Sequence, residues 1–99
     1  MADEQERDQT ALVEEDVTLR RKRALYRAQH RGTKEMDWMI GRYAQERLDS
    51  MTVDTLGTFE AFLEVADPTL NAWLLDPGMC DQLEFKGLID DIRHFNSLA

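Results

Sequence analysis

The sequence is poor in cysteine, with Cys80 as its single example in 99 residues. One cysteine cannot form an internal disulfide, so the chain does not belong to the disulfide-stabilised secreted domains. A lone thiol fits a reducing compartment, either a cytoplasm or a mitochondrial matrix. A free cysteine usually behaves as a small apolar side chain. We therefore expect Cys80 to serve in packing or at a helix edge.

Long apolar runs are also missing, and the longest, as in 72–75, extend over only a few residues. About 20 are needed to cross a bilayer, so we expect no membrane insertion. The first seventeen residues hold seven acids and one base, Arg7, so we expect no secretory or mitochondrial leader. The sequence thus favours the cytoplasm of a bacterium, and the mitochondrial matrix only if the chain is a processed form.

Residues that usually build catalytic sites are scarce. The five glycines are isolated from one another, so no glycine-rich phosphate loop is present. The two histidines, His30 and His94, lie far apart in the chain, and no CxxC or HxxxH pair occurs. A zinc site needs three or four such ligands. We therefore predict no metal site and no internal active site, which means that the chain is not an enzyme.

Charge is abundant but uneven. The net charge is −8, yet residues 20–34 carry seven bases and no acid, which leaves −15 on the rest. Three interpretations of this basic segment remain open: docking to an acidic protein surface, phosphate binding by a small nucleic-acid-binding regulator, or a solvated helix face balanced by acids. The surrounding negative charge disfavours nucleic acid as a partner.

The pattern of apolar residues predicts an all-α fold, a compact bundle of about five short helices. Residues 1–16 are polar and acidic without an apolar period, so we predict a disordered, flexible acidic tail followed by a helical domain over 17–99. We expect the free chain to be a monomer. Capping residues, glycine and proline place the helices at about 18–30, 33–48, 52–66, 67–75 and 80–95.

Each expected helix also predicts an inward face. Gly41 and Gly57 lie inside helical patterns and suggest places where helices pack closely. The inward residues of the last three helices are Val53, Leu56, Phe59, Phe62 and Leu63, then Leu70, Trp73 and Leu74, then Leu83, Leu88, Ile89, Ile92 and Phe95.

Four segments resemble a known family: Gly41-Arg42-Tyr43, the run 59–64, and two longer stretches that match its motifs. The stretch 31–37, Arg-Gly-Thr-Lys-Glu-Met-Asp, resembles the RGxxExD signature of the SdhE-type succinate dehydrogenase assembly factors. The stretch 67–74, Asp-Pro-Thr-Leu-Asn-Ala-Trp-Leu, is similar to the DPxLxxWL segment of that family. The resemblance covers about residues 18–95 and leaves the acidic tail outside.

The resemblance implies a chaperone-like assembly factor. Members of that family bind the flavoprotein subunit of succinate dehydrogenase, and in bacteria often fumarate reductase, and promote covalent attachment of FAD to a histidine of that subunit. The FAD would therefore belong to the partner, with no cofactor held stably by this chain. Positioning alone can lower a reaction barrier without supplying a reacting group.

The same resemblance places the partner-binding site at the junction of the first two helices. Each residue also has a purely structural interpretation: Arg31 as a solvated helix-end base, Gly32 as a helix terminator, and Glu35 and Asp37 as acids favoured by the helix dipole. Thr33, Lys34 and Gln29 depart from the family pattern and predict a more polar contact surface. Trp38 is expected to be partly buried, or an interface anchor if it is exposed. The predicted partner-binding residues are Arg31, Gly32, Glu35 and Asp37, with Arg27, His30 and Arg42 as flanking contacts.

Overall fold

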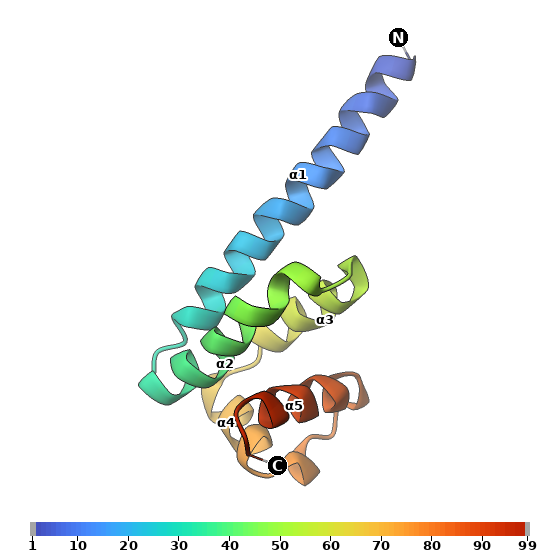
Figure 1. Cartoon of the computed structure of the whole chain (residues 1–99). Coiled ribbons are helices and arrows are strands. Elements are labelled where there is room, and N and C mark those ends of the chain that lie inside the picture. Colours follow the sequence, from blue (N-terminus) through green and yellow to red (C-terminus); the bar gives the residue numbers. More distant parts are fainter. Residues whose placement is uncertain (1, 99) are drawn as a thin grey trace.

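The computed structural model describes residues 2–98, with side chains described from Asp16 to Leu98. Within that range every regular element is a helix and none is a strand, so the all-α prediction is confirmed (Figure 1). The elements are α1 (Ala2–Gln29), α2 (Lys34–Arg47), η1 (Leu48–Ser50), α3 (Val53–Leu63), α4 (Asp67–Leu75), η2 (Pro77–Met79) and α5 (Leu83–Phe95).

The first helix is much longer than predicted. Its backbone is helical from Ala2, so the start expected at Thr18 is wrong, and the N-terminal part extends away from the bundle (Figure 1). No glycine or proline precedes Thr18, and most residues there are good helix formers, so nothing local stops the helix. The side chains of residues 1–15 lie outside the described residues. The flexible acidic tail over 1–16 therefore stays a prediction.

Local capping signals locate the next helices correctly. The hydroxyl of Thr33 accepts a hydrogen bond from the Met36 amide at 3.2 Å and caps α2. Thr52 caps α3 in the same way. Pro68 lies in the first turn of α4, as expected. Asp67, however, is not the cap residue, because α4 is preceded by Ala66 and the carboxylate of Asp67 points elsewhere.

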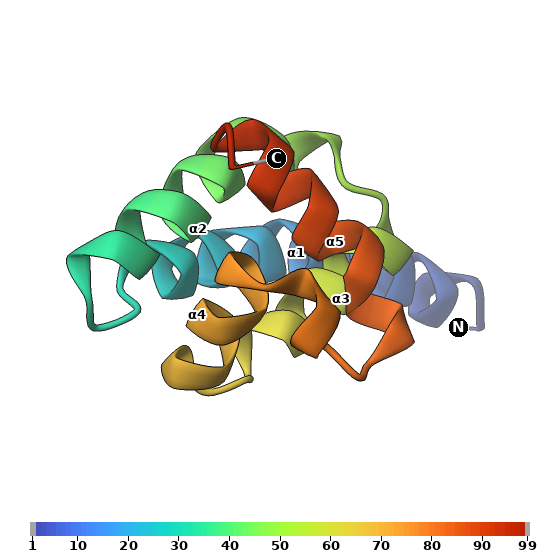
Figure 2. The same ribbon diagram turned by 90° about the horizontal axis from the view of Figure 1, so that it is seen from below.

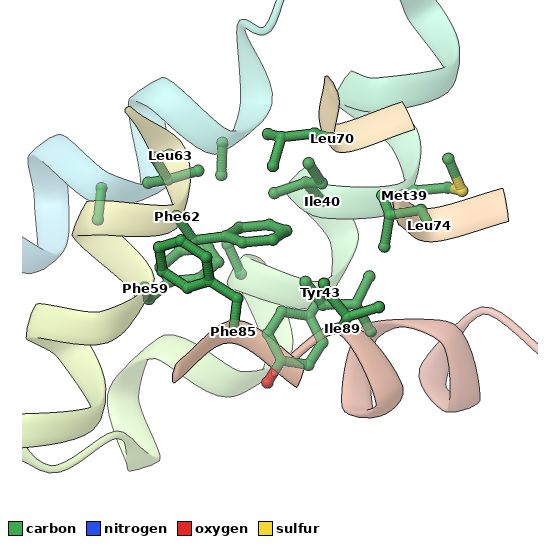
Figure 3. Packing of buried hydrophobic residues seen from close by; sticks show 14 of the residues in the cluster. Met39, Ile40, Tyr43, Phe59, Phe62, Leu63, Leu70, Leu74, Phe85 and Ile89 are labelled. Carbon is green, nitrogen blue, oxygen red and sulfur yellow. The ribbon is translucent and has the colours of Figure 1, made fainter. Parts of the chain in front are cut away.

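A core of buried apolar side chains joins all five helices (Figure 3). The aromatic rings meet edge to face, as for Phe62 and Phe85 with centroids 5.6 Å apart. Such edge-on contacts suit the ring quadrupoles. Cys80 is buried as expected. The largest fully buried side chains are Met36, Ile40, Leu56, Phe59, Phe62, Leu70, Leu74, Ile89 and Ile92.

Two predicted core residues are wrong. Leu83 is 82% exposed, because the buried face of α5 runs through Phe85, Ile89 and Ile92, and Leu83 lies about 200° around the helix from Phe85. Val53 is also exposed, as the first residue of α3. Both residues stand at helix starts, where the helical period has no preceding turn to fix which side faces inward.

Helices α1 and α2 form a hairpin, and Gly41 of α2 lets the two helices pack closely. A Cβ added at Gly41 would lie 3.2 Å from the Cα of Gln29 and 3.3 Å from the carbonyl oxygen of Ala28. The prediction of close packing at Gly41 is confirmed. At Gly57 it is wrong, because the nearest atom is a guanidinium nitrogen of Arg20 at 3.9 Å, an ordinary contact. In the view from below, α4 and α5 lie on the side of the hairpin that faces the viewer (Figure 2).

Candidate functional site

The signature stretch forms the corner where α1 ends and α2 begins (Figure 1). Gly32 has a φ of +113°, a backbone conformation that residues with a Cβ rarely adopt. It is exposed, as are Thr33, Lys34 and Glu35. Met36 turns inward and is buried. The corner thus presents a short exposed loop on a buried anchor.

Arg31 points into the molecule and holds this corner from behind. Its Nε lies 2.8 Å from Oδ1 of Asp67, while Nη1 and Nη2 donate to the carbonyl oxygens of Leu63 and Val65 at 2.5 and 2.9 Å. The side chain of Arg31 is only 10% exposed. It is therefore not a solvated helix-end base. Its N–H groups donate to acceptors that lie between the end of α3 and the start of α4.

Asp37 fixes the other side of the loop. Its Oδ1 accepts a hydrogen bond from the backbone amide of Arg31, and its own amide donates to the carbonyl oxygen of Thr33 at 2.9 Å. A carboxylate that bonds a free backbone amide in this way stabilises a helix entry. Asp37 is half-buried. Together with Arg31 it determines the shape of the loop.

Glu35 has a different environment. It is exposed, and within residues 16–98 its carboxylate has no hydrogen bond or ion pair. It lies at the rim of an open hollow of about 450 Å³. Thr33, Lys34, Glu35 and Met36 line this hollow on one side, and Asp67, Pro68 and Asn71 line it on the other. The two longer segments that carry the family resemblance therefore meet at one surface.

The predicted flanking residues surround the corner in part. Nδ1 of His30 donates to the carbonyl oxygen of Tyr26 at 2.7 Å, and the two rings are stacked with centroids 4.1 Å apart. Arg27 forms an exposed ion pair with Glu64. Arg42 stacks its guanidinium on the ring of Trp38, which is 54% exposed. Trp38 therefore meets the condition set for an interface anchor.

The chain itself neutralises part of the basic segment. Arg20 pairs with Glu60 at 2.5 Å, Arg27 with Glu64, and Arg31 with Asp67. The hydrogen bond that Arg20 donates to Glu60 is the main reason that the pKa of Arg20 is raised above its ordinary value. Arg21 donates to the carbonyl oxygen of Met51.

These pairs change how the basic segment should be interpreted. Three of its seven bases face carboxylates of α3 and α4 and cannot neutralise phosphates without giving them up. Lys22, Arg23 and Lys34 are the exposed bases that remain without a carboxylate partner among the described side chains. A phosphate-binding face over 20–34 is therefore not supported.

Among the described residues no group of three or more histidine, cysteine, aspartate or glutamate side chains is arranged to hold a metal ion. Nor does any helix of the described part have the length and apolar character needed to cross a membrane.

The chain can now be compared with known proteins. Residues 22–96 match the model of a family described as flavinator of succinate dehydrogenase. The chain belongs to this family. The match includes the whole corner, the hollow beside it and helices α2 to α5, and it ends close to the C-terminus of α5.

Individual relatives agree with the family match. A protein of Acetobacter pasteurianus named FAD assembly factor SdhE is 40% identical over 65 residues, which are 66% of this chain and 60% of that protein. Its namesake in Vibrio cholerae is 36% identical over 66 residues, 67% of this chain and 77% of that one. A mitochondrial succinate dehydrogenase assembly factor 2 from Lodderomyces elongisporus is 30% identical over 59 residues, covering 60% and 36%. The match thus spans less than two thirds of the Acetobacter protein. No solved structure matches this chain.

The sequence did not predict the contact between the signature stretch, 31–37, and the segment 67–74. Asp67 was expected to cap α4, and its partnership with Arg31 spans 36 positions in the chain. No local pattern predicts such a pairing. The only available indication was that both segments carry the family resemblance, which is compatible with their meeting in space.

Proposed function

We propose that the chain binds the flavoprotein subunit of succinate dehydrogenase and promotes the covalent attachment of FAD to it. The corner of α1 and α2 is the proposed contact surface. Gly32 and Glu35 would touch the partner, Arg31 and Asp37 would hold the loop in shape, and Arg27, His30 and Arg42 would flank it. FAD would stay with the partner, so the purified chain should be colourless.

The observation that carries this proposal is the division of labour within the signature. Arg31 and Asp37 direct their side chains to the chain itself, whereas Glu35 is exposed beside a hollow and has no partner within the described side chains. An exposed carboxylate on a loop that two buried contacts hold rigid is well suited to binding, because little order must be gained on association.

The proposed role requires no reacting group from the chain. A flavin and a histidine held in reactive contact by a bound assembly factor need no further catalyst from that factor, because orientation alone can remove a large part of a barrier. The reacting histidine would be the partner's. Binding to a fumarate reductase flavoprotein, a monomeric free state and a cytoplasmic location belong to the same proposal.

The experiment is covalent flavin fluorescence of the flavoprotein on a denaturing gel, in cells that lack this chain. We expect the fluorescence to be lost, to return with the wild-type chain, and to stay absent with Glu35→Ala. Glu84→Ala is the matched control, since Glu84 is likewise an exposed acid in the first turn of a helix. Full fluorescence without the chain would refute the function, and normal fluorescence with both Glu35→Ala and Gly32→Arg would refute the site.

A further inference from the structure

A row of aromatic rings and arginines continues from the corner along α2. Trp38 follows directly after Asp37, the last residue of the signature. The guanidinium carbon of Arg42 lies 4.4 Å from the centroid of the Trp38 ring and 5.6 Å from that of Phe95. The guanidinium carbon of Arg47 lies 5.6 Å from the same Phe95 ring. We call these four residues the arginine–aromatic face.

The arginines of this face differ from three arginines that come earlier in the chain. Arg20, Arg27 and Arg31 each pair with a carboxylate of the chain. Within residues 16–98 neither Arg42 nor Arg47 forms an ion pair, and both are exposed. On α5, the carboxylate of Asp91 accepts a hydrogen bond from the hydroxyl of Tyr43. The face therefore carries two unneutralised cations on a chain whose net charge is −8.

The geometry also indicates what these arginines are free to bind. A ring that stacks on a guanidinium covers the flat face of the guanidinium and leaves the N–H groups at the edge of the guanidinium available. Those edges match a carboxylate with two parallel hydrogen bonds. Stacking also fixes the arginine side chain beforehand, so less conformational freedom is lost on binding. An exposed tryptophan beside such an arginine is typical of interface anchors.

We infer that the arginine–aromatic face is a second part of the docking surface and binds a carboxylate-bearing segment of the flavoprotein. The inference rests on the proposed function and names the chemistry of the contact next to the signature corner. Lys22, Arg23 and Lys34 are also exposed without a carboxylate partner among the described side chains, but only Arg42 and Arg47 are held in place by aromatic rings, so these two favour one orientation of such a segment.

The first test is the dissociation constant of the complex between the purified chain and the flavoprotein subunit. We expect Arg42→Gln to weaken binding about tenfold, the scale of one charge-assisted contact at an interface. Arg42→Lys keeps the charge but loses the planar fork, and should recover only part of the affinity. Lys86→Gln is the charge-matched control, nine positions before Phe95 on α5, and should leave the affinity within about twofold. Circular dichroism establishes that each variant is folded.

The salt dependence of binding and fluorine labelling test whether a carboxylate-bearing segment of the flavoprotein binds at this face. The affinity of the wild-type chain should fall with increasing sodium chloride, and more steeply than that of Arg42→Gln. In a chain labelled with 5-fluorotryptophan, the resonance of Trp38 should shift on binding. The resonance of Trp73, which is 5% exposed, serves as the internal reference. An unmoved Trp38 resonance in the formed complex, an unchanged affinity for Arg42→Gln, or equal salt dependence of the two chains would each overturn the inference.

The outcomes separate this inference from the proposed function. If flavin attachment requires Glu35 but Arg42→Gln binds normally, only the second surface is refuted. If the wild-type chain does not bind the flavoprotein at all, both are refuted.

Discussion

Arg31 and Asp67 join the two longer segments of the chain that resemble the flavinator family. Their contact, 2.8 Å from Nε to Oδ1, is made by side chains that are 10% and 24% exposed, and Arg31 also bonds the carbonyl oxygens at the end of α3. It therefore connects the signature corner to the hollow beside it. The corner depends on a distant part of the chain for its shape.

Removing this contact should destabilise the whole domain. We expect Asp67→Asn and Arg31→Lys each to lower the free energy of unfolding by about 2–3 kcal/mol, because a charged group is left with poor partners in a buried place. Arg27→Gln breaks an ion pair whose side chains are 48% and 62% exposed, and should cost less than about 1 kcal/mol. Urea denaturation measures all three, and equal losses would contradict the structural role of Arg31.

Gly32 and Gly87 should respond in opposite directions to the same substitution. Gly32→Ala places a Cβ on a backbone with φ of +113°, and should destabilise the chain by about 1–2 kcal/mol. Gly87→Ala adds a Cβ with no atom within 4 Å in the interior of α5, and should stabilise it by up to about 1 kcal/mol. Thermal unfolding of the two variants beside the wild type tests this, and a loss of stability at Gly87 would contradict it.

The α1–α2 hairpin should tolerate no larger residue at Gly41. A Cβ there meets backbone atoms of Ala28 and Gln29, which cannot move aside as a flexible side chain can. We expect Gly41→Val to cost about 1–3 kcal/mol, the usual scale of overpacking. Gly57→Ala, in an ordinary contact, is the control. Urea denaturation that gave the same stability for both variants would show that the hairpin can open without cost.

Stability should fall at alkaline pH because of Tyr43. Burial, and next the hydrogen bond that its hydroxyl donates to Asp91, raise the pKa of Tyr43 well above its ordinary value near 10. The unfolded chain then releases this proton at a lower pH than the folded chain does. The contribution is complete below pH 10 and is lost as the pH rises above it, by up to about 1.4 kcal/mol per pH unit.

The variant Tyr43→Phe isolates this effect. It should be less stable than the wild type by about 1 kcal/mol at pH 8, because one hydrogen bond is lost. Above pH 10 the difference should shrink, since the variant has no hydroxyl to ionise. Urea denaturation at several pH values between 8 and 11 measures both curves. Parallel curves would show that Tyr43 does not control the alkaline loss.

The parts of the fold that the sequence predicted depend on near neighbours. Thr33, Thr52 and Pro68 act within three or four positions, so capping patterns located α2, α3 and α4. Leu83 was misplaced because a residue at a helix start has no preceding turn to set the inward face. The early start of α1 was missed because Thr18 can act as a cap or lie within a helix.

The candidate site was also predictable only where it depends on residues that are near one another in sequence. The turn at Gly32 follows from its neighbours, and the corner could be placed from the signature alone. The inward course of Arg31 could not, because its acceptors at Leu63, Val65 and Asp67 lie more than 30 positions away in sequence. A pattern read along the chain contains no distance between such positions.

The contacts of Arg31 also bear on biosynthesis. Residues 31 to 37 leave the ribosome before Leu63, Val65 and Asp67 do, so a growing chain contains the entire signature before the acceptors of the Arg31 side chain exist. Long-range contacts of this kind form late in folding. The proposed partner would therefore meet the complete corner only after residue 67 has been made and has folded. A product that ended before residue 63 would contain the whole signature but none of the acceptors that the Arg31 side chain needs to hold the corner.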